Sequence, residues 1–183
     1  MTKRVLVPLA PGFEEIEAVT IIDVLRRGGA DVTVAGTQGA MVEGSHGIVL
    51  TADALLSDVR EDSFDLVVLP GGMPGAANLR DDVAVLAMLR TTAAAGRWVA
   101  AICAAPIALS AAGLLSERSA TSYPTFEDQV AAREYREDRV VVDGNVVTSR
   151  GPGTALEFSL ELVRLLIGEP ECEKLTEAML VKR

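Results

Sequence analysis

The chain has 183 residues, of which 49% are hydrophobic and 23% are charged. These proportions are typical of a globular protein with a sizeable core, and we expect a single domain over residues 1–183. The net charge of −9 at pH 7 argues against binding to nucleic acids or anionic membranes, because both depend on clustered lysine and arginine. We find neither the roughly 20 apolar residues of a membrane span nor a signal-peptide core, and expect a cytoplasmic protein.

The chain contains two cysteines, Cys103 and Cys172, and a single histidine, His46. The cysteines lie far apart and form no CxxC pair, so the sequence predicts neither a disulfide framework nor a structural zinc site. With one histidine in the chain, we expect no bound metal. Acidic neighbours disfavour a thiolate at Cys172, for which we expect a structural role.

Apolar runs that end at glycine or proline alternate with longer helical segments along the chain. The predicted strands are residues 5–9, 31–35, 66–69 and 98–102, and the predicted helices are residues 13–27, 82–95 and 154–166, with one more helix from Cys103 to near Gly113. Thr154 and Glu157 have the spacing of a capping box. Residues 44–56 are expected to form an irregular or hairpin-like insertion, and residues 140–148 alternate around an Asp-Gly-Asn turn, which is a strong hairpin signal.

Strands separated by helices of this length predict a parallel sheet with helices on both faces. We therefore expect an α/β fold, namely a flavodoxin-like three-layer sandwich with a mostly parallel central sheet and one β-hairpin. Ligands of such sheets bind beyond the carboxyl ends of the strands. Turns at Gly12, at Gly71 and Gly72, and at Cys103 follow three of the predicted strands, so the fold should gather them at one edge.

Cys103 lies between a predicted strand and a helix, in the order of a nucleophile elbow that lacks the full glycine signature. Pro106 places the junction at or next to Cys103, because proline is tolerated in the first turn of a helix. A helix N-terminus stabilises an anion, which lowers the pKa of a thiol there. Cysteine is also often a small buried hydrophobic residue. A reactive and a structural interpretation therefore both stay open.

Glu17 shares one helical face with Phe13 and two further apolar residues. A carboxyl group in apolar surroundings is poorly solvated, which raises its pKa and keeps it protonated as a hydrogen-bond donor. Such an acid beside Cys103 would donate to a thiolate. Alternatively, Glu17 is a first-turn acid that complements the helix dipole, which is the interpretation we favour for Glu14 and Glu15.

Two glycine-containing segments, residues 70–75 and 150–154, follow predicted strands. The first allows close approach of the backbone, and its N–H groups are suited to hold a developing oxyanion, although a tight turn explains it as well. The second is explained by a capped helix start. Alanine follows Cys103, and nothing in the sequence brings His46 to it. A cysteine protease, which needs an adjacent base, is therefore disfavoured.

Taken together, four motifs resemble the ThiJ/PfpI superfamily, and within it the branch of the Parkinson-disease-associated protein deglycase. The motifs are residues 12–17, 69–72, 101–106 and 148–154, and the resemblance runs from Arg4 to the C-terminus. The order of all four makes the resemblance specific.

The resemblance implies a flavodoxin-like homodimer in which Cys103 is a nucleophile of low pKa and Glu17 is its protonated hydrogen-bond partner. It implies that the amides of Gly72 and Ala104 form an oxyanion pocket. It also places Arg27 near the pocket and the dimer interface.

Two positions depart from the family. Tyr123 stands where the animal members have a histidine, and Ala104 replaces the histidine that follows the cysteine in the peptidase-like branch. Tyr123 can donate a hydrogen bond near the substrate but is a poor base at neutral pH.

The resemblance implies a cofactor-independent glyoxalase III-like or deglycase enzyme. Its substrates would be 2-oxoaldehydes such as methylglyoxal, or their early glycation adducts. The alternative is an oxidative-stress sensor or chaperone that works through oxidation of Cys103.

Overall fold

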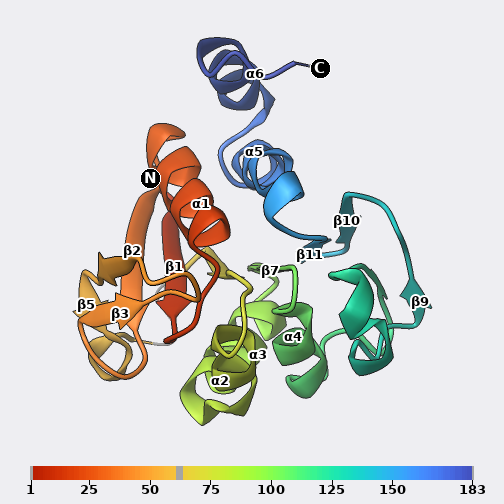
Figure 1. The fold of residues 1–183 in the computed structure, drawn as a ribbon. Helices are drawn as coiled ribbons and strands as arrows, with labels where there is room; N and C mark the ends of the chain where they lie inside the picture. The colour runs from red at the N-terminus through yellow and green to blue at the C-terminus, as the bar shows by residue number, and fades with distance from the viewer. Residues whose placement is uncertain (1, 61–63, 183) are drawn as a thin grey trace.

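A sheet of seven strands forms the centre of the molecule, in the order β10-β11-β7-β6-β1-β2-β5 (Figure 1). The computed structural model describes residues 2–60 and 64–182. The strands of this sheet are β1 (Arg4–Leu9), β2 (Asp31–Gly36), β5 (Ala54–Leu55), β6 (Leu66–Leu69), β7 (Trp98–Ile102), β10 (Val140–Asp143) and β11 (Val146–Ser149). All neighbouring strands are parallel except β10 and β11, which form a hairpin. The expected mostly parallel sheet is confirmed.

The central strands are buried on both faces. All four residues of β6 are buried, and β1 is buried from Val5 to Leu9. Continuous apolar runs, rather than alternating ones, are what a parallel sheet covered on both sides requires. The parallel direction of β1, β6 and β7 brings their carboxyl ends to one edge of the sheet.

Helices cover both faces of the sheet (Figure 1). On one face α1 packs along α5, and α6 packs on α5, whereas α2, α3 and α4 lie together on the other face. The helices are α1 (Glu15–Arg27), α2 (Gly75–Asp81), α3 (Val83–Ala94), α4 (Pro106–Ala111), α5 (Ala155–Leu166) and α6 (Glu169–Ala178). This is the expected three-layer sandwich. None of the helices in the described part of the chain has the length and apolarity that a membrane span needs.

Two smaller pairs of strands lie outside the main sheet. β3 (Met41–Glu43) and β4 (Val49–Thr51) are antiparallel, whereas β8 (Ser119–Ala120) and β9 (Glu134–Tyr135) are parallel. Short 3₁₀ helices cover Leu56–Asp58, Pro124–Gln129 and Pro152–Thr154. The β3–β4 pair adds a second hairpin to the one expected around Gly144: β4 and the connecting loop lie within residues 44–56, the segment expected to be irregular or hairpin-like, and β3 lies just before it.

The helix that follows Cys103 starts later than the sequence predicts. Cys103 and the next two residues form a turn, and α4 begins at Pro106. The reason is the backbone of Cys103, whose φ of 63° lies in the left-handed region and cannot be part of a right-handed helix. Pro106 is nevertheless in the first turn of α4, as its lack of an N–H group predicts.

The predicted capping box of α5 is wrong. Thr154 precedes the helix, but its side chain makes no capping hydrogen bond. Its hydroxyl instead bonds to the Ser149 hydroxyl at 2.7 Å and donates to the Gly151 carbonyl at 2.9 Å. Glu157 accepts a hydrogen bond from Arg139 at 2.6 Å. Thr154 therefore bonds within the turn that precedes α5, and Glu157 bonds to a residue distant in sequence, instead of the two forming a capping box.

Candidate active site

Cys103 occupies a sharp turn between β7 and α4. Its φ of 63° is rare for a residue with a side chain, and the residue is only 9% exposed. Two backbone hydrogen bonds hold the turn: the Cys103 amide donates to the Ser149 carbonyl at 3.0 Å, and the Tyr123 amide donates to the Cys103 carbonyl at 2.8 Å. A strained residue held by its surroundings is typical of functional sites, and the strand–turn–helix geometry is that of a nucleophile elbow.

The loop after β6 approaches the cysteine turn closely because two of its residues, Gly71 and Gly72, have no side chain. A Cβ atom on Gly71 would lie 2.6 Å from the Cys103 Cβ and 2.7 Å from Glu17 Oε2. Gly72 has a φ of +89°, and a Cβ there would lie 2.3 Å from the Glu14 nitrogen. Side chains at these two positions would push the loop away from the cysteine.

Two backbone amides point at the sulfur of Cys103. The amides of Gly72 and Ala104 donate hydrogen bonds to it, and both act to lower the pKa of the thiol. They are the amides that the family resemblance assigns to an oxyanion pocket. Two N–H donors next to the sulfur stabilise a thiolate. They are also placed to stabilise the negative oxygen that forms when the sulfur adds to a carbonyl carbon.

Glu17 is completely buried in the first turns of α1. Its Oε2 accepts a hydrogen bond from the Gly71 amide at 2.8 Å, while its Oε1 has no hydrogen-bond partner among the described residues. Burial raises the pKa of Glu17 to about 7, although the Gly71 hydrogen bond and the nearby Cys103 act to lower it. A large fraction of Glu17 therefore holds a proton at neutral pH, as the apolar helical face predicts.

The thiol of Cys103 and the carboxyl of Glu17 form a coupled pair. Burial raises the pKa of Cys103 to about 12, and the negative charge of Glu17 adds to this effect. The direction is opposite to the low pKa that the helix start and the family resemblance imply. The hydrogen bond between the thiol and Glu17 also raises the pKa of Cys103, and two neighbouring buried groups resist carrying two negative charges.

At neutral pH the pair carries at most one negative charge, and the lower pKa of Glu17 places that charge on the carboxylate. A Glu17 carboxylate accepts hydrogen bonds from the Gly71 amide and the Cys103 thiol, whereas a thiolate receives the amides of Gly72 and Ala104. When Glu17 keeps the proton, its charge no longer opposes the thiolate and its O–H is available to the sulfur. Protonation of Glu17 is thus the condition for a reactive Cys103.

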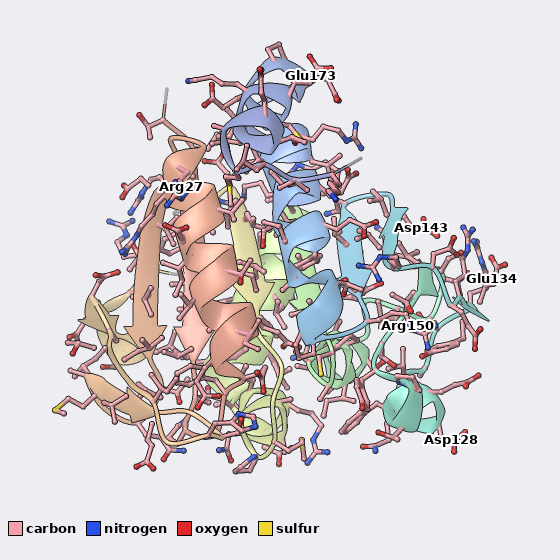
Figure 2. The ribbon with its side chains drawn as sticks, turned by 45° about the horizontal axis from the view of Figure 1, so that its top comes forward. Arg27, Asp128, Glu134, Asp143, Arg150 and Glu173 are labelled. Carbon is pink, nitrogen blue, oxygen red and sulfur yellow. The ribbon has the colours of Figure 1, made fainter. Side chains whose placement is uncertain are left out.

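Arg27 lies away from this site within one chain. It is an exposed residue at the C-terminal end of α1 (Figure 2), ten residues beyond Glu17, which corresponds to about 15 Å along a helix. Its side chain donates to Asp23 at 2.7 Å. Within one chain the length of α1 therefore separates Arg27 from Cys103, and its expected place near the pocket stays a prediction that depends on the second copy of a dimer.

Tyr123 lies at the rim of the site. It is 43% exposed, and its amide is bonded to the Cys103 carbonyl. Together with Arg150 and Gly151, it helps to line an open cavity of about 290 Å³. Arg150 lies near the N-terminal end of α5 (Figure 2). Tyr123, which the family resemblance places where animal members have a histidine, thus borders the cysteine turn.

The sequence did not predict the surroundings of His46. Its ring nitrogen Nδ1 lies 2.9 Å from Glu15 Oε2 and 3.5 Å from Glu14 Oε2. The two acids were interpreted as partners of the helix dipole, yet Glu15 instead holds the β3–β4 loop through hydrogen bonds to His46. The spacing of glycines around residues 44–47 indicated a turn, but not where the turn would lie.

The chain combines a flavodoxin-like fold with a strained cysteine at the carboxyl edge of the sheet and a buried acid beside the sulfur. Together these features define the class of this protein. The DJ-1/PfpI family matches residues 3–165, and the chain belongs to this family.

Among curated relatives, protein DJ-1 homologs A and B of Arabidopsis thaliana are each 46% identical to the chain over 99% of its length. The chain spans less than half of these two relatives, 47% and 42% respectively. The glutathione-independent glyoxalase DJR-1.2 of Caenorhabditis elegans is 37% identical, over 97% of this chain and 96% of that protein.

Solved structures agree with the fold over its whole length. DJ-1beta of Drosophila melanogaster has a TM-score of 0.95 and 42% identity, covering 100% of both chains. An oxidized DJ-1 of Toxoplasma gondii has a TM-score of 0.95 and 44% identity, with the same coverage.

Replacement of Glu17 tests its coupling to Cys103. Glu17→Gln keeps a hydrogen-bond donor without the acidic proton, and Glu17→Leu keeps neither. Because the charge of Glu17 raises the pKa of Cys103 and neither variant carries that charge, we expect the apparent pKa of Cys103 alkylation, measured from the iodoacetamide rate against pH, to fall in both. It should fall further in Glu17→Gln, which keeps a donor for the thiolate. All proteins carry Cys172→Ser so that one thiol reacts. An unchanged or higher apparent pKa in both variants would contradict the coupling of the two groups.

The raised pKa of Glu17 also predicts how stability depends on pH. Because the pKa of Glu17 is about 7 in the folded state against 4.5 for an ordinary glutamate, the stability that its protonated form contributes is present below pH 4.5 and is lost as the pH rises to about 7. In a Cys103→Ala background, the free energy of unfolding in urea should fall by on the order of 3 kcal/mol across this range, relative to Cys103→Ala with Glu17→Gln. A constant difference between the two proteins would mean that Glu17 ionises normally.

Proposed function

We propose that the chain is a cofactor-independent glyoxalase III-like or deglycase enzyme that acts on methylglyoxal-type 2-oxoaldehydes or their early glycation adducts. The observation that carries this proposal is the buried pair of Cys103 and Glu17 with two amides directed at the sulfur. The relative from Caenorhabditis elegans that is named a glutathione-independent glyoxalase supports the same substrate class.

In the first step, the Cys103 thiolate adds to the aldehyde carbon of methylglyoxal and a C–S bond forms. The amides of Gly72 and Ala104 stabilise the negative charge that develops on the aldehyde oxygen. Glu17 then gives its proton to that oxygen. The product of this step is a hemithioacetal, and Glu17 is left as a carboxylate.

In the second step, the Glu17 carboxylate removes the proton from the carbon bonded to sulfur and returns it to the neighbouring carbon. The hydroxyl proton of the hemithioacetal passes to the ketone oxygen, so the hemithioacetal becomes a thioester as the former ketone becomes an alcohol. Water then cleaves the C–S bond, which gives lactate and restores the thiol. One carbon is oxidised and its neighbour is reduced, so the electrons balance within the substrate. A pKa of about 7 for Glu17 suits an acid that must both give and take a proton near neutrality.

We also propose that the chain works as a homodimer. Exposed apolar side chains gather on α1 and on the β3–β4 hairpin, namely Ile16, Val19, Met41, Ile48 and Val49. Val19 and Leu50 line one groove between these two elements. A second copy packed there would cover apolar surface that a monomer leaves in water, and the family resemblance implies such a dimer with Arg27 near its interface.

Activity measurements on two variants test the enzymatic proposal. Cys103→Ala should abolish the conversion of methylglyoxal to lactate, and Glu17→Gln should slow it by about 10²-fold or more, because general acid–base catalysis is removed. Lactate is quantified directly, and Cys172→Ala serves as the matched cysteine control with the parental rate. Parental rates in both site variants would refute the proposal.

A second candidate function is an oxidative-stress sensor or chaperone that works through oxidation of Cys103 to the sulfinate. The similarity to an oxidized DJ-1 of Toxoplasma gondii favours it. A protonated Glu17 would donate a charge-assisted hydrogen bond to a sulfinate oxygen as it does to a thiolate. One geometry therefore serves both functions.

Mild peroxide distinguishes this candidate. Intact-mass measurement should show the gain of two oxygen atoms in the parent protein and in Cys172→Ser, and no such gain in Cys103→Ala. If Cys103 stays unmodified at peroxide concentrations that oxidise ordinary exposed thiols, the sensor function is excluded.

A further inference from the structure

Two buried carboxylates and one imidazole meet outside the Cys103–Glu17 pair. Glu14 and Glu15, at the start of α1, are 9% and 4% exposed. His46, from the β3–β4 loop, directs Nδ1 to Glu15 Oε2 at 2.9 Å and to Glu14 Oε2 at 3.5 Å. One nitrogen or oxygen ligand atom from each residue lies within 4.8 Å of the others.

These distances suit a small tetrahedral metal ion. Zn²⁺ binds imidazole nitrogen and carboxylate oxygen at about 2.0–2.2 Å, so two neighbouring ligand atoms of a tetrahedral site are about 3.3–3.5 Å apart. The separations of 2.9 and 3.5 Å differ from that spacing by a few tenths of an ångström at most. Three protein ligands leave a fourth position for water.

Outer hydrogen bonds hold Glu15 in the orientation that a ligand requires. Its Oε1 accepts from the amide of His46 at 2.6 Å and from the amide of Ile48 at 3.4 Å. Its Oε2 lies 2.9 Å from the imidazole Nδ1 and accepts from the Ser45 hydroxyl at 3.3 Å. Gly44 permits this packing, because a Cβ there would lie 2.4 Å from Glu15 Oε1. Such outer contacts are what orient carboxylate ligands in metal sites.

The charges of the cluster are unbalanced. In residues 2–60 and 64–182, His46 is the one cationic side chain in contact with the two carboxylates. Glu15 accepts a hydrogen bond from the amide of His46 and pairs with its ring nitrogen. The side chain of Glu14, 11% exposed, receives no hydrogen bond within the same residues and approaches the His46 ring. Two buried acids thus face one imidazole, which carries at most one positive charge.

We propose that Glu14, Glu15 and His46 bind a divalent transition-metal ion, with Zn²⁺ as the best match. The ion replaces the proton on Nδ1 and neutralises both carboxylates. An imidazole with two carboxylates favours Zn²⁺ over Mg²⁺, which prefers oxygen ligands and retains its waters. The proposal does not depend on the enzymatic function, since Cys103 and Glu17 are not ligands.

Zinc titration of the full chain tests this site. The protein carries Cys103→Ser and Cys172→Ser, so that no thiolate can bind the metal. Isothermal titration calorimetry should give one Zn²⁺ per chain, Co²⁺ should show the visible absorption of a four-coordinate ion, and Mg²⁺ in excess should not displace either.

His46→Ala and Glu14→Gln should each weaken Zn²⁺ binding by about tenfold or more. Glu43→Gln is the matched control, because Glu43 is an exposed acid on β3 outside the cluster, and it should bind as the parent does. Circular dichroism checks the folding of each variant, and Glu14→Gln preserves side-chain shape if His46→Ala disturbs the loop. The proposal is overturned if Zn²⁺ does not bind, if both ligand variants bind it as the parent does, or if Mg²⁺ competes equally.

Discussion

The Cys103–Glu17 pair is buried deeply enough to favour one negative charge over two, and the surrounding structure is arranged around that constraint. The Gly71 amide and the Cys103 thiol stabilise the charge on Glu17, and the amides of Gly72 and Ala104 stabilise it on sulfur when Glu17 holds the proton. The groups come from segments far apart in the chain. They meet because β1, β6 and β7 are parallel and end at the same edge of the sheet, where bound groups of this fold class are found.

Patterns in the sequence predict the layers of the fold well, and local backbone detail poorly. The strands β6 and β7 have the predicted bounds, because uninterrupted apolar runs between glycine, proline or charged residues leave little freedom. Helix α2 was not predicted, since Gly75–Asp81 is short and carries no apolar period. The hydroxyl of Thr154 had a local partner available in the sequence but bonds to Ser149 and Gly151 instead, and such a choice is settled only by tertiary packing.

The candidate site likewise contains features that the sequence predicts and features that it does not. The apolar face of α1 predicts the burial of Glu17, and the strand end before Pro106 predicts the turn at Cys103. The positive φ of Cys103 is not encoded in any local pattern, because the hydrogen bonds to Ser149 and Tyr123 impose it. The environment of His46 depends on how the β3–β4 hairpin folds back on the start of α1. The family resemblance places Arg27 near the pocket, whereas within one chain Arg27 lies at the C-terminal end of α1, away from Glu17.

The preference for a single charge would make the two proposed functions, enzyme and sensor, exclusive states of the same residues. Conversion of the thiol to a sulfinate would fix a negative charge beside Glu17 that no later step removes. The acid would then be held in its protonated form over the range in which it otherwise exchanges its proton. Its hydrogen bond to the oxidised sulfur group would then be permanent. Oxidation would therefore stop catalysis in two ways. It would remove the nucleophilic thiolate, and it would hold on Glu17 the proton that the reaction must transfer.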